Sequence, residues 1–193
     1  MMRRLLSGDD AVVACAVLFL LSVSVVRSQI SHSICSPPTN RFTVSVNAGA
    51  GQLGYYQFAE CGNVINPILG LRLNQLYTFV QEDRSNWFHP LGFAYGPDGA
   101  LAEQPELEPG VASPSSSQPF CADSLACPRA RYMQQQQFLG VDGTDDFGLD
   151  AYEPQFSVPL LDWIDRGVFS VDVTFDDANV GQDIFYFCHV RVV

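Results

Sequence analysis

The sequence predicts an all-β fold, a Greek-key sandwich or barrel, from three observations. Several short segments alternate apolar and polar residues, which is the period of a strand with one buried face. Clusters of glycine, proline, asparagine and aspartate separate these segments, and such clusters are typical of turns. The sequence has no long amphipathic stretch with a helical period. At 193 residues, the chain is expected to hold one domain of this class.

The predicted strands follow one another along the chain. Phe42, Val44 and Val46 alternate with polar residues in 41–47, and 168–175 alternates as regularly. The other predicted strands are 55–58, 68–73, 76–80, 93–95 and 184–190.

Three of these segments carry further expectations. Segments 68–73 and 76–80 are separated by an Asn-Gln pair, so a hairpin or two consecutive strands is expected there. Segment 184–190 is aromatic and β-branched, which favours a place in the centre of a sheet. A single helical turn is expected within 155–165.

Residues 100–158 differ from the rest of the chain. The part from 103 to 119 is rich in proline, serine and glutamate, and 134–137 is a run of glutamines. No sustained period is present, so a long irregular surface insertion is predicted. Six residues of this stretch match the ligand positions of a calcium loop, namely Asp142, Thr144, Asp146, Gly148, Asp150 and Glu153. Because Phe147 stands where that loop needs glycine, a solvated acidic loop is the preferred interpretation.

The N-terminal residues have the composition of a targeting segment. Two arginines precede an apolar run over 11–26, and the small residue Ser28 follows it. This order predicts a signal peptide over 1–28 and a secreted domain over 29–193. Two aspartates ahead of the apolar run leave an uncleaved membrane anchor as the alternative.

The charge limits the partners. The chain has a formal net charge of −11 and no lysine, so it lacks the basic face that nucleic acid or an anionic membrane requires. Docking to a basic extracellular partner fits this charge. A merely solvated acidic surface is the preferred interpretation.

The cysteine count leaves one thiol over. Five cysteines follow the predicted signal peptide, namely Cys35, Cys61, Cys121, Cys127 and Cys188. In an oxidising compartment most of them are expected to pair, and Cys35–Cys61 and Cys121–Cys127 are the simplest pairs. On that scheme Cys188 is the odd thiol. The alternatives are an inert buried thiol at Cys188, or a disulfide from Cys188 to Cys35 or Cys61.

Two residues stand where copper chemistry could be placed. His89 lies at the entry to a predicted strand, and Cys188 lies near the end of the last one. A blue-copper site uses one thiolate, two imidazoles and a weak axial thioether. A role as ligand would explain why Cys188 is unpaired. Without a metal, His89 is a polar residue at the mouth of a strand.

Several short motifs resemble those of small secreted cupredoxin-like (plastocyanin-like) domains. The motifs are Asn66-Pro67, Leu76-Tyr77-Thr78-Phe79, Ser85-Asn86, His89-Pro90-Leu91 and Tyr186-Phe187-Cys188. That family carries an "NP…TYTF…SN…HPL" block and a closing "YYC-x-x-H-x-x-M" block. The resemblance covers roughly 64–99 and 168–191. It implies a cupredoxin-like Greek-key fold and a mononuclear copper site that passes single electrons to a redox partner.

The resemblance also shows which ligands are missing. It makes His89 the first imidazole ligand and Cys188 the thiolate. The second imidazole falls on Arg191, which stays protonated and cannot bind copper, and the methionine position lies beyond Val193. A genuine loss of ligands and a misread or spliced end of the coding sequence are both consistent with this pattern.

The other two histidines are weaker candidates. His189 is adjacent to Cys188 and should point to the opposite face of the strand, so an ordinary strand residue is its preferred interpretation. His32 lies in an unanchored N-terminal segment.

Two functions follow from these residues. The first is mononuclear copper binding and electron transfer, with an incomplete site in this chain. The second is a metal-free extracellular binding or structural module on the same scaffold. An enzyme is not predicted, since a multicopper oxidase needs paired His-x-His motifs and the chain has three histidines.

Overall fold

The computed structural model describes residues 34–47, 55–62, 64–103, 105–107, 130–175 and 183–189. All of them belong to one compact unit that begins at His32. The predicted signal peptide, the predicted Cys121–Cys127 pair, His32 and Arg191 lie outside the described residues. In the described ranges, no helix has the length and apolar character needed to span a bilayer.

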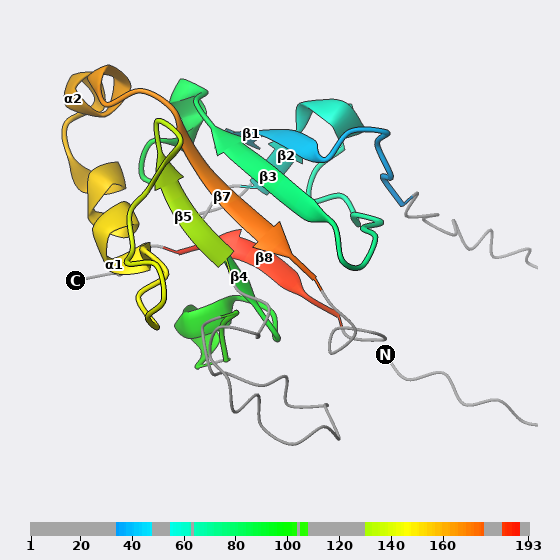
Figure 1. Ribbon diagram of the computed structural model, residues 1–193. Helices are drawn as coiled ribbons and strands as arrows, with labels where there is room; N and C mark the ends of the chain where they lie inside the picture. Colours follow the sequence, from blue (N-terminus) through cyan, green and yellow to red (C-terminus); the bar gives the residue numbers. More distant parts are fainter. Residues whose placement is uncertain are drawn as a thin grey trace, which may run out of the picture. The chain divides into compact units, whose positions relative to one another are not determined.

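Two β-sheets form the framework (Figure 1), which confirms the prediction of a mainly β fold. The strands of the larger sheet, in spatial order, are β2 (Tyr55–Phe58), β1 (Arg41–Asn47), β3 (Leu76–Gln81), β7 (Phe169–Thr174), β5 (Ala130–Gln134) and β6 (Gln137–Phe138). Strands β1 and β3 are parallel, and the other neighbours are antiparallel. The smaller sheet pairs β4 (Leu91–Ala94) with β8 (Phe185–Cys188) in antiparallel fashion.

The core lies between the two sheets. The rings of Phe79 on β3 and Phe93 on β4 have centroids 5.1 Å apart. At the other side of the interface, the rings of Phe58 on β2 and Tyr186 on β8 are also 5.1 Å apart. The alternation seen in the sequence of β1 places Phe42 in this core. Aromatic pairs of this kind hold the sheets face to face.

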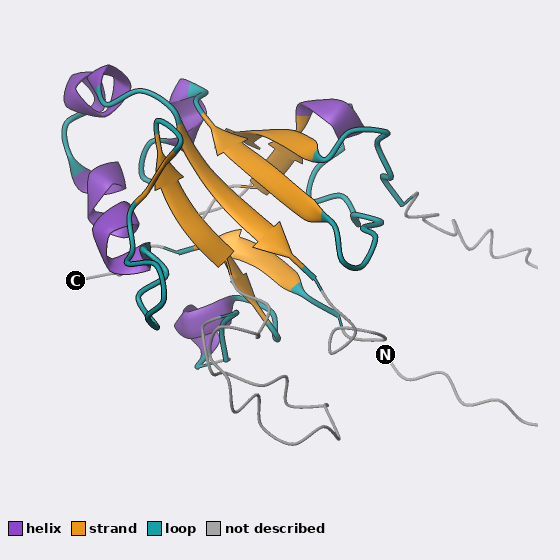
Figure 2. Cartoon of the chain, viewed as in Figure 1, coloured by secondary structure: helices purple, strands orange, loops and turns teal. Residues whose placement is uncertain are grey.

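Short helices lie at several places around the two sheets (Figure 2). They are the α-helices α1 (Leu149–Tyr152) and α2 (Leu160–Asp165), and the 3₁₀ helices η2 (Ala59–Cys61), η3 (Arg84–Asn86), η4 (Gly99–Ala102) and η5 (Glu153–Ser157). The rings of Tyr152, Phe156 and Trp163 pack on Phe169 of β7 with centroids 5.0–5.8 Å apart. Helix α2 confirms the helical turn predicted within 155–165.

The predicted irregular insertion is wrong for its second half. Strand β5 pairs with β7 from Ala130 to Gln134, so this part of 100–158 belongs to the larger sheet. Its buried side chains are Ala130 and Tyr132. Two inward positions in a five-residue strand are too few for an alternating pattern to be recognised.

The predicted central position of the last strand is also wrong. Among the described strands, β8 pairs only with β4. Phe187 and Cys188 in its second half are buried, whereas Phe185 and Tyr186 in its first half are half-buried. Phe187 lies over Gly99, where a Cβ atom would come within 2.3 Å of the ring carbon Cε1 and the backbone has φ +50°. A glycine is therefore required beneath this ring.

Segment 68–73 is not a regular strand. It forms a single parallel bridge between Leu69 and Cys35, with the Gly70 amide donating to the Cys35 carbonyl at 2.8 Å. The predicted hairpin with 76–80 is therefore replaced by a contact with the N-terminal segment. A one-residue bridge cannot be distinguished from a strand by composition alone.

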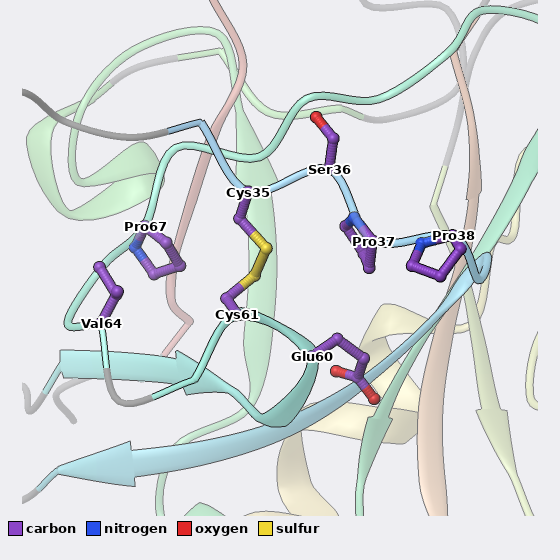
Figure 3. A pocket seen from close by; sticks show the side chains of 8 residues that line it. All are labelled: Cys35, Ser36, Pro37, Pro38, Glu60, Cys61, Val64 and Pro67. Atoms are coloured by element: carbon purple, nitrogen blue, oxygen red, sulfur yellow. A yellow bond between two sulfur atoms is a disulfide. The ribbon is translucent and has the colours of Figure 1, made fainter.

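The disulfide between Cys35 and Cys61 confirms one predicted pair. It joins the N-terminal segment to η2, beside a shallow pocket of about 370 Å³ (Figure 3). Glu60, on the same short helix, accepts hydrogen bonds from the Thr43 amide at 2.8 and 3.1 Å. The disulfide and this carboxylate together fix η2 against β1.

We expect loss of the disulfide to destabilise the fold. Cys35→Ala/Cys61→Ala frees a loop with a sequence separation of 26 residues, and restoring its entropy should lower the free energy of unfolding by about 3 kcal/mol. Urea denaturation of the variant measures this loss. Wild-type protein kept reduced is the control and should unfold at the same midpoint as the variant. A loss below ~1 kcal/mol would contradict the expected effect.

A candidate metal centre at His89 and Cys188

The smaller sheet brings the two predicted site residues together. His89 comes two residues before Leu91, which lies opposite Cys188 in the β4–β8 register. The His89 Nδ1 atom is 3.3 Å from the Cys188 Sγ atom, although the two residues are 99 positions apart in sequence. Cys188 is the free cysteine of the described residues and is buried. The two residues singled out in the sequence are therefore neighbours in the structure.

A buried polar network holds the backbone around His89. Gln81, the last residue of β3, is fully buried. Its Nε2 atom donates to Asn86 Oδ1 at 2.9 Å and to the His89 carbonyl at 2.7 Å. Its Oε1 atom accepts from the Leu91 amide at 2.9 Å and from the Tyr152 hydroxyl at 2.6 Å. The side chain of Gln81 therefore fixes the backbone at both His89 and Leu91.

The Ser85-Asn86 motif ties the same loop to β1. Asn86 Nδ2 donates to the Val44 carbonyl at 2.8 Å, and the Val46 amide donates to Ser85 Oγ at 2.9 Å. Within the loop, the His89 amide donates to the Asn86 carbonyl at 2.8 Å. These residues are thus positioning residues for His89.

Tyr56 on β2 supports the site from the larger sheet. Its hydroxyl donates to the carbonyls of His89 and Pro90, each at 3.1 Å. Its own backbone amide donates to Asn66 Oδ1 at 2.9 Å. Burial is the main reason that the pKa of Tyr56 is well above its usual value, with a further contribution from Cys188. The hydroxyl therefore stays protonated as a donor.

Burial also controls the thiol. Only 5% of Cys188 is exposed, and burial raises the pKa of its thiol to about 12, with the Tyr56 hydroxyl acting in the opposite direction. Without a metal the sulfur is therefore protonated at neutral pH. Its other neighbour is the Phe88 carbonyl, 3.8 Å from the sulfur. A metal ion would displace the thiol proton on binding.

The spacing of the two side chains fits one metal ion. Metal–sulfur and metal–nitrogen bonds of about 2.3 and 2.0 Å span a 3.3 Å gap at an angle of roughly 100°. The rest of a blue-copper site is not supplied by the part of the chain that the structure describes. Among the described residues, no group of three or more His, Cys, Asp or Glu side chains is arranged so that it could hold a metal ion. His89 and Cys188 are therefore two candidate ligands, whereas such a site uses four.

His189 is turned away from His89 and Cys188, as predicted, but it is not an ordinary strand residue. Its Nε2 atom lies 3.0 Å from Glu106 Oε2 and its Nδ1 atom lies 3.4 Å from Glu153 Oε2. All three side chains are largely buried. Burial alone lowers the pKa of His189, but Glu106 and Glu153 outweigh it and raise the pKa above its usual value. His189 thus joins β8 to two other segments, through its hydrogen bond with Glu106 and its proximity to Glu153, while its Nδ1 atom is buried without a hydrogen-bond partner among the described residues.

The acidic residues of the calcium-loop register face different partners. Asp142, the first position, pairs with Arg131 at 2.8 Å, whereas Glu153, the last position, is buried against His189. Asp146 accepts a hydrogen bond from the Gly148 amide at 3.0 Å. The first and last carboxylates of the register are therefore engaged at separate places.

Sequence reasoning missed the groups that hold the site in place. Gln81 directly follows the predicted strand 76–80, and Tyr152 lies in the predicted insertion; neither position indicates a buried hydrogen bond. Ser85 and Asn86 were noted only as part of a resemblance.

Comparison of this chain with protein-family models, curated proteins and solved structures finds no match.

Proposed function

We propose that the chain is a secreted cupredoxin-like protein that binds one copper ion through His89 and Cys188. The observation that carries this proposal is the 3.3 Å distance between the His89 Nδ1 and Cys188 Sγ atoms. A thiolate and an imidazole are donors that suit copper. Cys188 remains a thiol while Cys35 and Cys61 form a disulfide, and a role as ligand explains this difference.

The fold and the disulfide support the same proposal. His89 precedes one strand of the smaller sheet and Cys188 ends the other, in the order that the resemblance to cupredoxins implies. A disulfide suits the oxidising environment of a secreted protein. Single-electron exchange with a redox or basic extracellular partner is the function that the resemblance adds.

A metal-free binding module is the second candidate, and His189 favours it. Its imidazole is held between Glu106 and Glu153 and is not available to copper. The Gln81 network fixes the His89 loop by hydrogen bonds alone. On this second interpretation, the thiol and imidazole form only a weak hydrogen bond.

Copper titration separates the two candidates. With the proposed site, native mass spectrometry shows one copper per chain, and an intense thiolate-to-copper absorption band develops in the visible region. Cys188→Ser should abolish the band, and His89→Gln should weaken copper binding by more than about tenfold, since metal affinity is sensitive even to groups behind the ligands.

His32→Gln provides the matched histidine control and should leave the band and the stoichiometry unchanged. Circular dichroism and thermal unfolding verify that each variant is folded. A wild-type protein that unfolds cooperatively yet takes up no copper would exclude the copper proposal and leave the metal-free module.

A further inference from the structure

An apolar cleft of about 660 Å³ lies at the opposite end of β8 from Cys188. Its walls come from 66–73, from the ends of β4 and β7, and from the start of β8. Ala94 at the end of β4 pairs with Phe185 at the start of β8 (Figure 1). At about 3.3 Å per residue, Phe185 and Cys188 are roughly 10 Å apart. The cleft is therefore separate from the candidate metal centre.

Aromatic rings form much of the inner surface of the cleft. Phe79, Phe93 and Phe175 belong to the buried core and also line it, and the half-buried Phe185 and Tyr186 complete the wall. Its volume is within the range of about 300–1,000 Å³ that is usual for small-molecule sites. Phe79, Phe93 and Phe175 are at most 6% exposed, so an apolar body entering this space would remove from water mainly the half-buried surface of Phe185 and Tyr186, which favours binding.

The mouth of the cleft adds exposed aliphatic surface. Ile68 and Leu73 line the cleft and are 51% and 39% exposed. Such aliphatic side chains next to an aromatic hollow extend the apolar surface that a ligand can cover.

Two carboxylates on the lining determine the charge of a suitable ligand. Asp98 is in the turn after β4 and Asp183 directly precedes β8, and both are exposed. Neither carboxylate has a hydrogen-bond or ion-pair partner in the described part of the chain. The Tyr186 hydroxyl already donates to the Pro67 carbonyl at 2.8 Å. The carboxylates can only accept hydrogen bonds, so the ligand must supply the donors.

We propose that this cleft binds an organic ammonium ion that has an apolar, preferably aromatic, body. The body occupies the aromatic hollow, and the ammonium group lies near Asp98 and Asp183. Aromatic faces also attract cations, so the walls and the carboxylates favour the same charge. A carboxylic acid of the same shape is repelled by both carboxylates and by the net charge of −11.

Three compounds with one body and different charges test the proposal. They are 4-phenylbutylamine, 4-phenylbutanol and 4-phenylbutyrate, each titrated into ¹⁵N-labelled full-length protein. The amine should shift the amide resonances of Ile184 and Phe185 saturably. The alcohol should bind more weakly and the acid more weakly still. Equal affinity for the amine and the acid would overturn the proposal, and so would the absence of saturable shifts.

Charge-neutral variants locate the ammonium group. Asp98→Asn/Asp183→Asn should weaken amine binding by about fivefold, which corresponds to the modest strength of exposed ion pairs, while binding of the alcohol stays the same. Asp162→Asn/Asp165→Asn on α2 removes two exposed charges outside the cleft lining and is the matched control. Equal loss of affinity in the control and in Asp98→Asn/Asp183→Asn would show that only net charge matters and would also overturn the proposal. Copper binding at Cys188 is measured separately, so failure of either proposal is distinguishable.

Discussion

Replacement of Gln81 by methionine is expected to lower the free energy of unfolding by about 4 kcal/mol or more. Methionine fills a similar volume, so the loss comes from hydrogen bonds rather than from a cavity. The substitution removes the Gln81 bond from Asn86 Oδ1, the Leu91 amide and the Tyr152 hydroxyl, whereas the His89 carbonyl keeps its bond from the Tyr56 hydroxyl. Each buried polar group left unsatisfied costs about 1–3 kcal/mol. Urea denaturation followed by circular dichroism measures the loss.

Gln137→Met is the control for this substitution, because Gln137 is an exposed strand residue and its replacement should change stability by less than about 0.5 kcal/mol. A loss below about 1 kcal/mol for Gln81→Met would mean that the network is dispensable. The same variant also bears on the copper proposal. If Gln81 positions His89, Gln81→Met should weaken copper binding while the folded variant keeps the thiolate-to-copper band, since Cys188 is unchanged.

The sequence predicted the strands that have a clear buried face. Strand β1 is an example: Phe42, Val44 and Val46 alternate with partly exposed residues, and the same three side chains are buried in the structure. Strand β7 behaves in the same way over Phe169–Thr174. A period of two over six or seven residues is sufficient to predict a strand and its buried face. A shift of one position would expose every apolar side chain.

The sequence could not assign strand neighbours. The composition of β8 suggested the centre of a sheet, since aromatic and β-branched residues gather in buried strands. In the structure, Phe187 is covered by the turn at Gly99 rather than by another strand. The composition of a strand therefore predicts that it is buried, but it does not predict which element packs against it.

At the candidate site, too, the sequence indicated which residue types could act but not which residues contact them. The pairing of His89 with Cys188 could be inferred because both residue types are copper ligands and one cysteine was left over. The positions of Gln81, Tyr56 and Tyr152 around them depend on long-range packing, with Gln81 and Tyr152 71 residues apart. No local pattern carries that information, since each of these residues is common on strand and helix surfaces.

The His189 ion pair is a feature that sequence reasoning underestimated. Of the 193 residues only three are histidines, and this one lies beside the candidate thiolate. The alternation of the strand correctly separates its side chain from Cys188. The partners of His189 on the face of β8 opposite Cys188 could not be predicted. Both of them, Glu106 and Glu153, come from the region that was expected to be an irregular insertion.

His189→Ala is the substitution that should reveal the strength of this buried cluster. It leaves the carboxylates of Glu106 and Glu153 buried without the imidazole, and breaking a buried pair in this way typically destabilises a protein by about 3–5 kcal/mol. The triple variant His189→Met/Glu106→Gln/Glu153→Gln has no charged group at this position and should recover most of the loss. Urea denaturation of both variants measures the difference.

Hydrogen exchange shows whether the cluster acts as a link between segments. The Leu107 amide donates to the Phe93 carbonyl at 2.9 Å, one residue after Glu106, so its exchange reports on this segment. In His189→Ala, Leu107 should exchange faster than the amides of β3, because the segment has lost its anchor to β8. If Leu107 and β3 lose protection equally, the imidazole contributes only to global stability. If neither changes, the ion pair is not a structural link, and β4–β8 pairing alone holds this side of the domain.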